Sequence, residues 1–170
     1  PAAVLKHIAD RSAPQATLFM GVPTMYGRLL VQPQLQHDAV QGMRLFISGS
    51  APLLPAAFDA FQVRTGHTIL ERYGMSETGM LCSNPCRGSE GKRVAGSVGK
   101  PLPGVKLRIV DDEGAPVATG ETGHVEVHGP NVFVGYLGMP EKTSEAFTPD
   151  GWFRTGDVGR TDREGRVQLV

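Results

Sequence analysis

The chain has 170 residues, of which 40% are apolar, enough to build the core of one domain or of two small lobes. Its seventeen basic and seventeen acidic residues cancel to a formal net charge of zero without any block of like charge, which argues against a nucleic-acid partner. There is no run of 18 apolar residues and no charged-then-apolar leader, so we expect a soluble chain without a transmembrane segment, either cytoplasmic or imported into an organelle.

The first half of the chain alternates helical and strand patterns. Residues 2–10 carry apolar side chains at helical spacing, and a turn over residues 10–14 follows. The apolar runs 16–20, 43–48 and 68–70 are short and bounded by glycine, proline or polar residues, which is typical of buried parallel strands.

Between these strands the sequence predicts helices that start at proline. One begins at Pro23, and the other covers residues 55–65, ends at Gly66 and is lined by Phe58, Phe61 and Val63. Strands that alternate with helices indicate a parallel sheet, in which ligands gather at the carboxyl ends of the strands.

The second half has the pattern of antiparallel strands. Residues 105–110 and 123–128 alternate in polarity, with the turn DDEG after the first, and residues 158–170 read as a hairpin around the turn DREG. A short helix is expected over residues 140–147. We therefore place a boundary near residue 95, with an α/β subdomain over 1–95 and a β-rich subdomain over 96–170.

Two cysteines, Cys82 and Cys86, lie in the segment LCSNPCRG, which reads as a loop. Common metal sites need four ligands, and the nearest histidine, His67, lies upstream across an expected strand. Free thiols of a reducing compartment are the favoured interpretation.

The stretch ERYGMSET joins residue types that suit a nucleotide. The ring of Tyr73 offers a flat surface on which a purine can stack, and Gly74 lets a ligand approach the backbone. The Ser76 hydroxyl can donate to a phosphate oxygen, and Glu77 offers an oxygen ligand for Mg²⁺. The structural alternative is a core tyrosine followed by the N-cap of a helix.

Two other segments bear on this choice. The small-residue turn at Gly49, Ser50, Ala51 and Pro52 can lie against a planar base, although a tight strand-to-helix connection has the same composition. Asp157, beside a glycine, can accept two ribose hydroxyl protons, or it is simply an aspartate in a glycine turn.

Four motifs in order, GSAPL, ERYGMSET, GPNVFVGYLGMPEKT and DGWFRTGD, resemble the adenylate-forming superfamily of acyl-CoA synthetases, luciferases and peptide-synthetase adenylation domains. The resemblance runs from about residue 16 to the C-terminus. It implies the end of a parallel-sheet α/β subdomain followed by a small β-barrel-like subdomain of that family's N-terminal domain.

The resemblance also implies roles for single residues. The turn Gly49–Pro52 would line the adenine pocket, Tyr73 would stack on adenine, with Gly74 and Met75 beside the nucleotide, and Asp157 would hold the ribose. Ser76, where the family usually has threonine, would contact the α-phosphate, and Glu77 would bind magnesium. ATP, Mg²⁺ and coenzyme A are the implied cofactor and cosubstrates, and the carboxylic acid is the remaining substrate.

Arg72 and Met80 are the expected substrate-binding residues. Many relatives have a small residue before the tyrosine, whereas the guanidinium of Arg72 can pair with a second carboxylate, as in the malonyl-CoA synthetase branch, which LERYGM and the flanking segments resemble. The alternative is that Arg72 pairs with Glu71 or another surface acid.

Two parts of the family pattern do not occur in the 170 residues: the Ser/Thr/Gly-rich phosphate loop ending in Pro-Lys-Gly, and the C-terminal domain that supplies the adenylation lysine. We therefore expect these residues to be part of a larger enzyme whose flanking subdomains complete it, and to be inactive alone. Two other functions stay open at this point: a noncatalytic AMP- or ATP-binding module, and another adenylating relative such as an aryl-CoA ligase or a peptide-synthetase domain.

Overall fold

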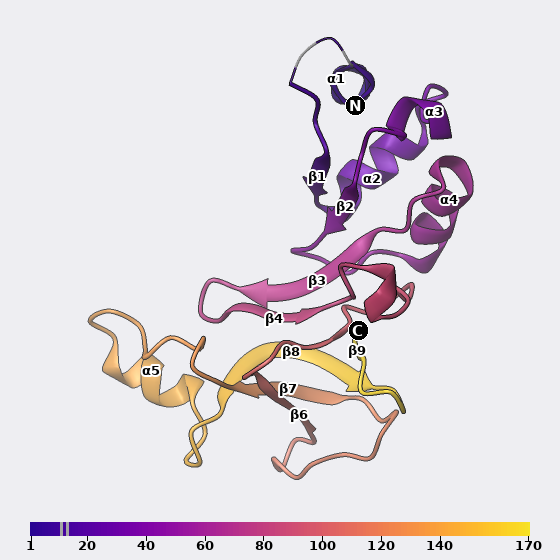
Figure 1. Ribbon diagram of the computed structural model, residues 1–170. Helices are drawn as coiled ribbons and strands as arrows, with labels where there is room; N and C mark the ends of the chain where they lie inside the picture. Colours follow the sequence, from indigo (N-terminus) through magenta and orange to yellow (C-terminus); the bar gives the residue numbers. More distant parts are fainter. Residues whose placement is uncertain (11, 13) are drawn as a thin grey trace. The chain divides into compact units, whose positions relative to one another are not determined.

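The computed structural model describes residues 1–10, 12 and 14–170, which form two compact units (Figure 1). Unit 1 comprises residues 1–72 and 84–96, and unit 2 comprises residues 73–83 and 97–170. The segment 73–83, which carries YGMSET, thus packs with the second half of the chain, although the boundary near residue 95 assigns it to the first. The turn expected over residues 10–14 includes residues 11 and 13, which lie outside the described residues.

Unit 1 holds helices and the first strands. Its elements are α1 (Ala2–Ala9), β1 (Leu18–Gly21), α2 (Pro23–Leu30), α3 (His37–Val40), β2 (Leu45–Ser48), α4 (Pro55–Thr65), the start of β3 (Leu70–Met75) and the 3₁₀ turn η1 (Gly88–Glu90). Strand β2 pairs in parallel with β1 and with β3, as the sequence predicts.

Strand β1 is less buried than its apolar sequence predicts. Leu18 is 38% and Met20 54% exposed, whereas Phe19 packs against the core of buried helix and strand side chains. The expectation of a fully buried strand is wrong here because β1 ends the strand order of its sheet, and only one of its faces meets the helices.

Helix α4 follows the expected limits but not the expected face. Pro55 begins it, and Gly66 ends it with a left-handed backbone at φ 77°, a conformation that glycine adopts without steric cost. Phe58 and Phe61 are buried, whereas Val63 is 86% exposed. Val63 lies two residues after Phe61, about 200° around a 3.6-residue helix, so it points away from the core.

Unit 2 is built mainly from antiparallel strands. Its elements are the end of β3, then β4 (Gly79–Ser83), β5 (Lys100–Pro101), β6 (Lys106–Val110), β7 (Gly123–His128), α5 (Pro140–Ala146), β8 (Phe153–Thr161) and β9 (Val167–Leu169). Strands β6, β7, β8 and β9 form one antiparallel sheet in that order, which curves in Figure 1, as expected for a barrel-like subdomain.

The core of unit 2 lies on one face of this sheet. Val125 and Val127 on β7 are buried with Ile109, Phe153 and Val167, as the alternating pattern predicts. The hairpin turn DREG also forms where expected, closed by a hydrogen bond from the Gly165 amide to the Asp162 carbonyl. The parallel sheet of unit 1 and the curled antiparallel sheet of unit 2 confirm the predicted fold class.

Two expected features near the motif are corrected. The strand placed at residues 68–70 begins at Leu70 and continues to Met75, so the first part of ERYGMSET lies inside a strand. The segment read as a loop around the cysteines contains β4, in which Cys82 is buried. The second cysteine, Cys86, is exposed, and both cysteines are free thiols.

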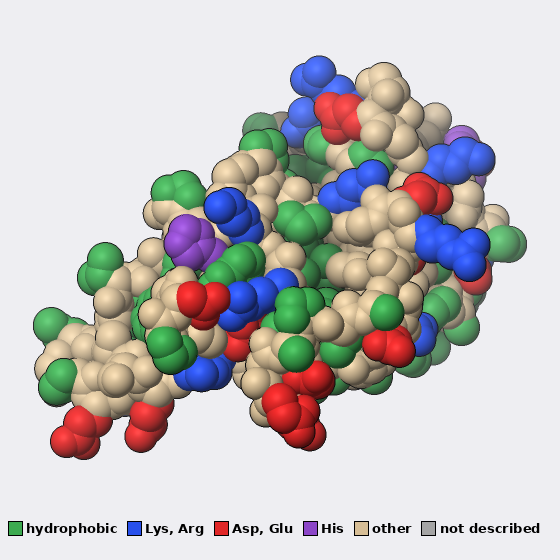
Figure 2. Space-filling model, turned by 90° about the horizontal axis from the view of Figure 1, so that it is seen from below, with side chains coloured by type: hydrophobic (Ala, Val, Ile, Leu, Met, Phe, Trp, Pro, Cys, Tyr) green, Lys and Arg blue, Asp and Glu red, His purple; other side chains and the backbone are tan. Residues whose placement is uncertain are grey.

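On the face shown in Figure 2, basic and acidic side chains are interspersed and do not form a large patch of one sign. Among the helices that the structure describes, none is long and apolar enough to cross a bilayer.

The aromatic core of unit 1 yields a stability prediction. The ring of Phe61 is fully buried and makes edge-to-face contacts with Tyr26 and Phe46, at centroid distances of 5.4 and 4.9 Å. Phe61→Ala should lower the free energy of unfolding by about 3 to 5 kcal/mol because it leaves a cavity. Val63→Ala on the exposed side of α4 is the control, with a change within about 0.5 kcal/mol. Urea unfolding of both variants measures the difference; equal losses would contradict the assigned helix face.

Candidate functional site

The residues expected at the nucleotide belong mostly to unit 2 and start at the turn between β3 and β4. Ser76–Thr78 form this turn, which the Thr78 amide closes by donating to the Met75 carbonyl at 3.1 Å. The alternative of a helix N-cap is therefore wrong. Ser76 is exposed and Glu77 half-buried, so both can be reached from solvent.

Tyr73 and Asp157 meet although 84 residues separate them. The Tyr73 hydroxyl donates a hydrogen bond to Oδ2 of Asp157. The Tyr73 side chain is only 7% exposed and packs with Leu81, Cys82 and Val98, so it is also a core residue. Burial, together with the bond to Asp157, raises the pKa of Tyr73, so the phenol keeps its proton and acts as the donor.

An irregularity in β8 places Asp157. Between the pairs Glu126 with Arg154 and His124 with Val158, β8 advances four residues while β7 advances two. Gly156 lies inside this bulge at φ 79°, and the Asp157 amide donates to the Thr155 hydroxyl at 3.1 Å. Bulges of this kind redirect a side chain, and here the redirected side chain is the carboxylate that meets Tyr73.

The other motif residues of unit 2 have structural contacts of their own. A Cβ at Gly74 would lie 2.1 Å from the Gly79 carbonyl oxygen, so the close approach of the neighbouring strand is enough to require glycine there. Met75 packs partly buried against the core of unit 2. Met80 is 37% exposed, and its carbonyl accepts a hydrogen bond from Asn131.

In unit 1 the small-residue turn after β2 has a strained backbone. Ser50 has φ 67°, a left-handed value unusual for serine and of a kind that tends to cluster at functional sites. Ser50, Ala51 and Pro52 are exposed. The following Leu53 is buried, and its amide donates to Oε2 of Glu71 at 3.3 Å, which fixes the end of the turn.

Arg72 lies against this turn. A Cβ built on Gly49 would lie 3.5 Å from Cγ and 3.7 Å from Cζ of Arg72, so the arginine side chain passes directly over the glycine. The alternative pairing of Arg72 with Glu71 is wrong, because Glu71 Oε1 has no partner among the described residues and Oε2 accepts from backbone amides. Neighbouring residues of a strand point to opposite faces, which separates the two side chains.

A hollow of about 200 Å³ opens beside Arg72 within unit 1. Its lining is largely apolar apart from the serine and the arginine: Met20, Gly21, Val22, Met25, Ile47, Gly49, Ser50 and Arg72. A small space with apolar walls and a cation suits a short organic acid better than a long chain.

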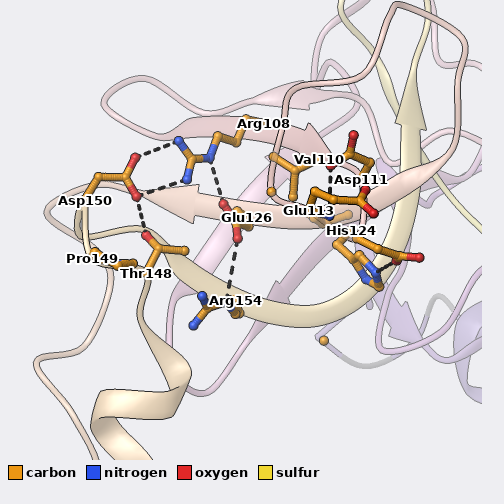
Figure 3. A pocket seen from close by; sticks show the side chains of 14 residues that line it. Arg108, Val110, Asp111, Glu113, His124, Glu126, Thr148, Pro149, Asp150 and Arg154 are labelled. Atoms are coloured by element: carbon orange, nitrogen blue, oxygen red, sulfur yellow. Dashed lines mark hydrogen bonds and ion pairs between the residues drawn. The ribbon is translucent and has the colours of Figure 1, made fainter.

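Unit 2 contains a second cavity, of about 530 Å³, which none of the expected nucleotide residues lines (Figure 3). Arg108 bridges Glu126 and Asp150 there, with nitrogen–oxygen distances of 2.7 and 2.8 Å, and Arg154 pairs with Glu126 at 3.8 Å. Glu126 is 4% exposed, and these arginines neutralise it. The cluster therefore links β6, β7, β8 and the loop at Asp150.

Glu77 is the residue that fits a magnesium ion. The described residues contain no group of three or more acidic, histidine or cysteine side chains placed to hold a metal. Magnesium is nevertheless bound commonly by one or two carboxylates together with substrate phosphates. The half-buried Glu77 accepts a hydrogen bond on Oε1 from Tyr136 at 3.2 Å, and a single carboxylate held in this way is compatible with that mode.

Three contacts were not predicted from the sequence. Asn131 and Tyr136 bind the turn that carries Glu77, and Glu71 anchors the turn after β2. Asn131 and Tyr136 belong to the family motif GPNVFVGYLGMPEKT, which marks this segment as a candidate for function. The motif does not indicate, however, that these two side chains contact the turn that carries Glu77. Glu71 falls just outside the predicted strand over residues 68–70, so the sequence gives no signal that it is buried.

Comparison with known proteins places these motifs in a family. The family model described as AMP-binding enzyme matches residues 4–137. The chain belongs to this family of AMP-binding enzymes. Among curated members, the chain is 43% identical over 169 residues to a protein named malonate–CoA ligase from Arabidopsis thaliana, a match that covers 95% of this chain.

Solved structures of the family show the same fold. ATP-bound MatB from Rhodopseudomonas palustris superposes with a TM-score of 0.91 at 49% identity, over 99% of this chain and 32% of MatB. A malonyl-CoA ligase in a ternary product complex with methylmalonyl-CoA and AMP gives 0.82 at 40% identity, over 99% of this chain and 35% of its own. The chain spans about a third or less of the relatives it matches, 27% in the case of the Arabidopsis protein.

The buried carboxyl of Glu71 yields a pH prediction. Burial raises its pKa from 4.5 to about 7, although hydrogen bonds from Leu53 and Gly96 oppose the shift. The folded state therefore binds a proton that the unfolded chain releases between pH 4.5 and 7, and the free energy of unfolding falls over that window by on the order of 3 kcal/mol. Glu71→Gln should remove this slope.

Urea unfolding between pH 4.5 and 8 measures the effect as the difference between variant and wild type. Ser48, the β2 residue paired with Glu71, provides the control, because Ser48→Ala removes a buried hydroxyl but keeps the acid and should keep the slope. Parallel pH profiles for wild type and Glu71→Gln would show that Glu71 does not titrate in this window.

Proposed function

We propose that these residues are part of an ATP-dependent acyl-CoA synthetase that adenylates a short dicarboxylic acid, with malonate as the first candidate. The observation that carries the proposal is the hydrogen bond between Tyr73 and Asp157, which joins the YGMSET and TGD motifs within unit 2. Membership of the AMP-binding family and the names of its similar members support it.

In this proposal unit 2 supplies most of the nucleotide contacts. Asp157 accepts hydrogen bonds from the ribose hydroxyls while its Oδ2 holds the Tyr73 phenol. The ring of Tyr73, with Gly74 and Met75, lies beside the adenine. For unit 1, we propose from the family resemblance alone that the turn Gly49–Pro52 is an adenine-binding segment. Because the Tyr73 ring is mostly buried, only a small part of it is available for stacking.

The chemistry at phosphorus is governed by charge. A substrate carboxylate oxygen attacks the α-phosphorus of ATP, forming an acyl adenylate as the bond to pyrophosphate breaks. The exposed Ser76 hydroxyl donates to an α-phosphate oxygen, where negative charge accumulates in the transition state. Glu77 would hold Mg²⁺, which offsets the charge of the phosphates when it is bound. The coenzyme A thiolate then attacks the acyl carbon, and AMP leaves.

Arg72 selects the acid. Its guanidinium borders the small hollow of unit 1, where it can form two parallel hydrogen bonds with a second carboxylate. Met80 is proposed as the other substrate contact. A fatty acid would place a hydrocarbon chain against this charge, which is unfavourable.

The proposal includes the expectation that residues 1–170 alone have no synthetase activity, because no Pro-Lys-Gly phosphate loop occurs in them. The experiments below therefore use the complete enzyme that contains them. If the complete protein binds AMP tightly but does not catalyse pyrophosphate exchange, the result would support a noncatalytic AMP-binding module instead.

The ribose assignment predicts a change in nucleotide preference. Wild type should bind AMP more tightly than 2′,3′-dideoxy-AMP, because hydrogen bonds to a charged carboxylate contribute about 1.5 to 3 kcal/mol. Asp157→Asn keeps an oxygen for Tyr73 but loses the charge, and should reduce this preference about tenfold. Calorimetry of both nucleotides measures it, with the exposed Asp112→Asn as control. An unchanged preference in Asp157→Asn would remove Asp157 from the ribose site.

The substrate assignment predicts a change in acid selectivity. Arg72→Ala should reduce the preference for malonate over acetate or butyrate roughly 30-fold or more, because loss of a buried bidentate pair costs about 2 to 5 kcal/mol. Pyrophosphate exchange with a panel of carboxylic acids measures kcat/KM for each. Arg28→Ala, a change to an arginine that does not line the hollow, is the control. Unchanged malonate selectivity in Arg72→Ala would exclude the dicarboxylate assignment.

A further inference from the structure

The segment over residues 129–139, from the motif GPNVFVGYLGMPEKT, is fastened to the turn between β3 and β4. Asn131 Nδ2 donates to the Thr78 carbonyl at 2.8 Å, and the Phe133 amide donates to the Glu77 carbonyl at 2.7 Å. A third bond reaches a side chain, because the Tyr136 hydroxyl donates to Oε1 of Glu77 at 3.2 Å. All of these residues belong to unit 2.

Tyr136 is itself held on several sides. Its ring meets Phe133 edge-on at a centroid distance of 4.8 Å, and the Lys142 ammonium lies 4.5 Å from the ring centroid. The Tyr136 amide also donates to the Thr143 hydroxyl at 2.9 Å. The hydroxyl therefore approaches Glu77 from a side chain with little rotational freedom.

We propose that Tyr136 is a positioning residue that orients the Glu77 carboxylate for magnesium. The inference rests on the proposed function, in which Glu77 is the metal ligand. The side chain of the half-buried Glu77 has three rotatable bonds, and ordering them costs free energy when the metal binds. A neutral donor fixed on Oε1 removes part of that cost and leaves the charge and Oε2 available to the ion.

The protonation of Tyr136 is consistent with this role. A tyrosine phenol ordinarily keeps its proton up to about pH 10, so the hydroxyl is a donor at neutral pH. Groups that orient a metal ligand in this way matter in general, since their removal weakens metal affinity or activity about 10- to 100-fold.

Tyr136→Phe tests the inference in the complete enzyme, because it deletes the hydroxyl and keeps the ring with its aromatic and ammonium contacts. Electron paramagnetic resonance of Mn²⁺ in the presence of ATP should show metal binding to the enzyme about tenfold weaker than in wild type. The KM for Mg²⁺ should rise by a similar factor, with kcat at saturating Mg²⁺ within about twofold of wild type.

Tyr26→Phe is the matched control, since Tyr26 also donates through its hydroxyl, to the Ile47 carbonyl in unit 1. It should leave Mn²⁺ affinity unchanged. Equal Mn²⁺ affinity in wild type and Tyr136→Phe would overturn the inference. The inference would also fail if the loss of Mn²⁺ binding in Tyr136→Phe were fully accounted for by the fraction of unfolded variant, as determined by urea titration.

Glu77→Gln separates this result from the proposed function. If Glu77→Gln weakens Mn²⁺ binding and Tyr136→Phe does not, only the positioning role fails. If Glu77→Gln leaves Mn²⁺ binding unchanged, the metal assignment fails and the inference with it.

Discussion

The hydrogen bond from the Tyr73 hydroxyl to the Asp157 carboxylate is the interaction on which the proposed nucleotide site of unit 2 depends. It joins the end of β3 to a bulge in β8, two places that are remote in sequence. The bond satisfies a phenol that would otherwise lose its partner on burial, and it holds a carboxylate at a fixed orientation. The tyrosine thus serves the core of the unit and the site at the same time.

The turn after β2 likewise combines structural contacts with residues proposed for function. Glu71 is buried, yet it holds the backbone of Leu53 and so the end of the turn that carries the strained Ser50. On the other side of the strand, Arg72 covers Gly49 and borders the hollow. Strand alternation puts these two side chains on opposite faces, so the Glu71 carboxylate supports the turn while the Arg72 side chain borders the hollow.

Buried charge alone does not mark a ligand site in this molecule. The carboxylate of Glu126 is as buried as that of Glu71, but two arginines face it and every charge of the cluster is matched (Figure 3). In the part of the chain that the structure describes, one carboxylate oxygen of Glu71 has no hydrogen-bond partner, and burial raises the pKa of this group. Because the charges beside the larger cavity neutralise one another, we assign that cluster a structural role. We propose functional roles instead for the residues around the smaller hollow and in the β3–β4 turn.

The sequence by itself determined the fold class, the order of most elements and the family, because apolar periodicity and four ordered motifs are local properties of the chain. It also named Tyr73 and Asp157 without showing that they touch. Only the tertiary structure decided the burial of β1, the outward side of Val63, the continuation of β3 through the motif, and the contacts of Glu71 and Tyr136. The physical reason is that these features depend on which neighbour covers a face, and a bulge or a long-range hydrogen bond leaves no periodic signal along the chain.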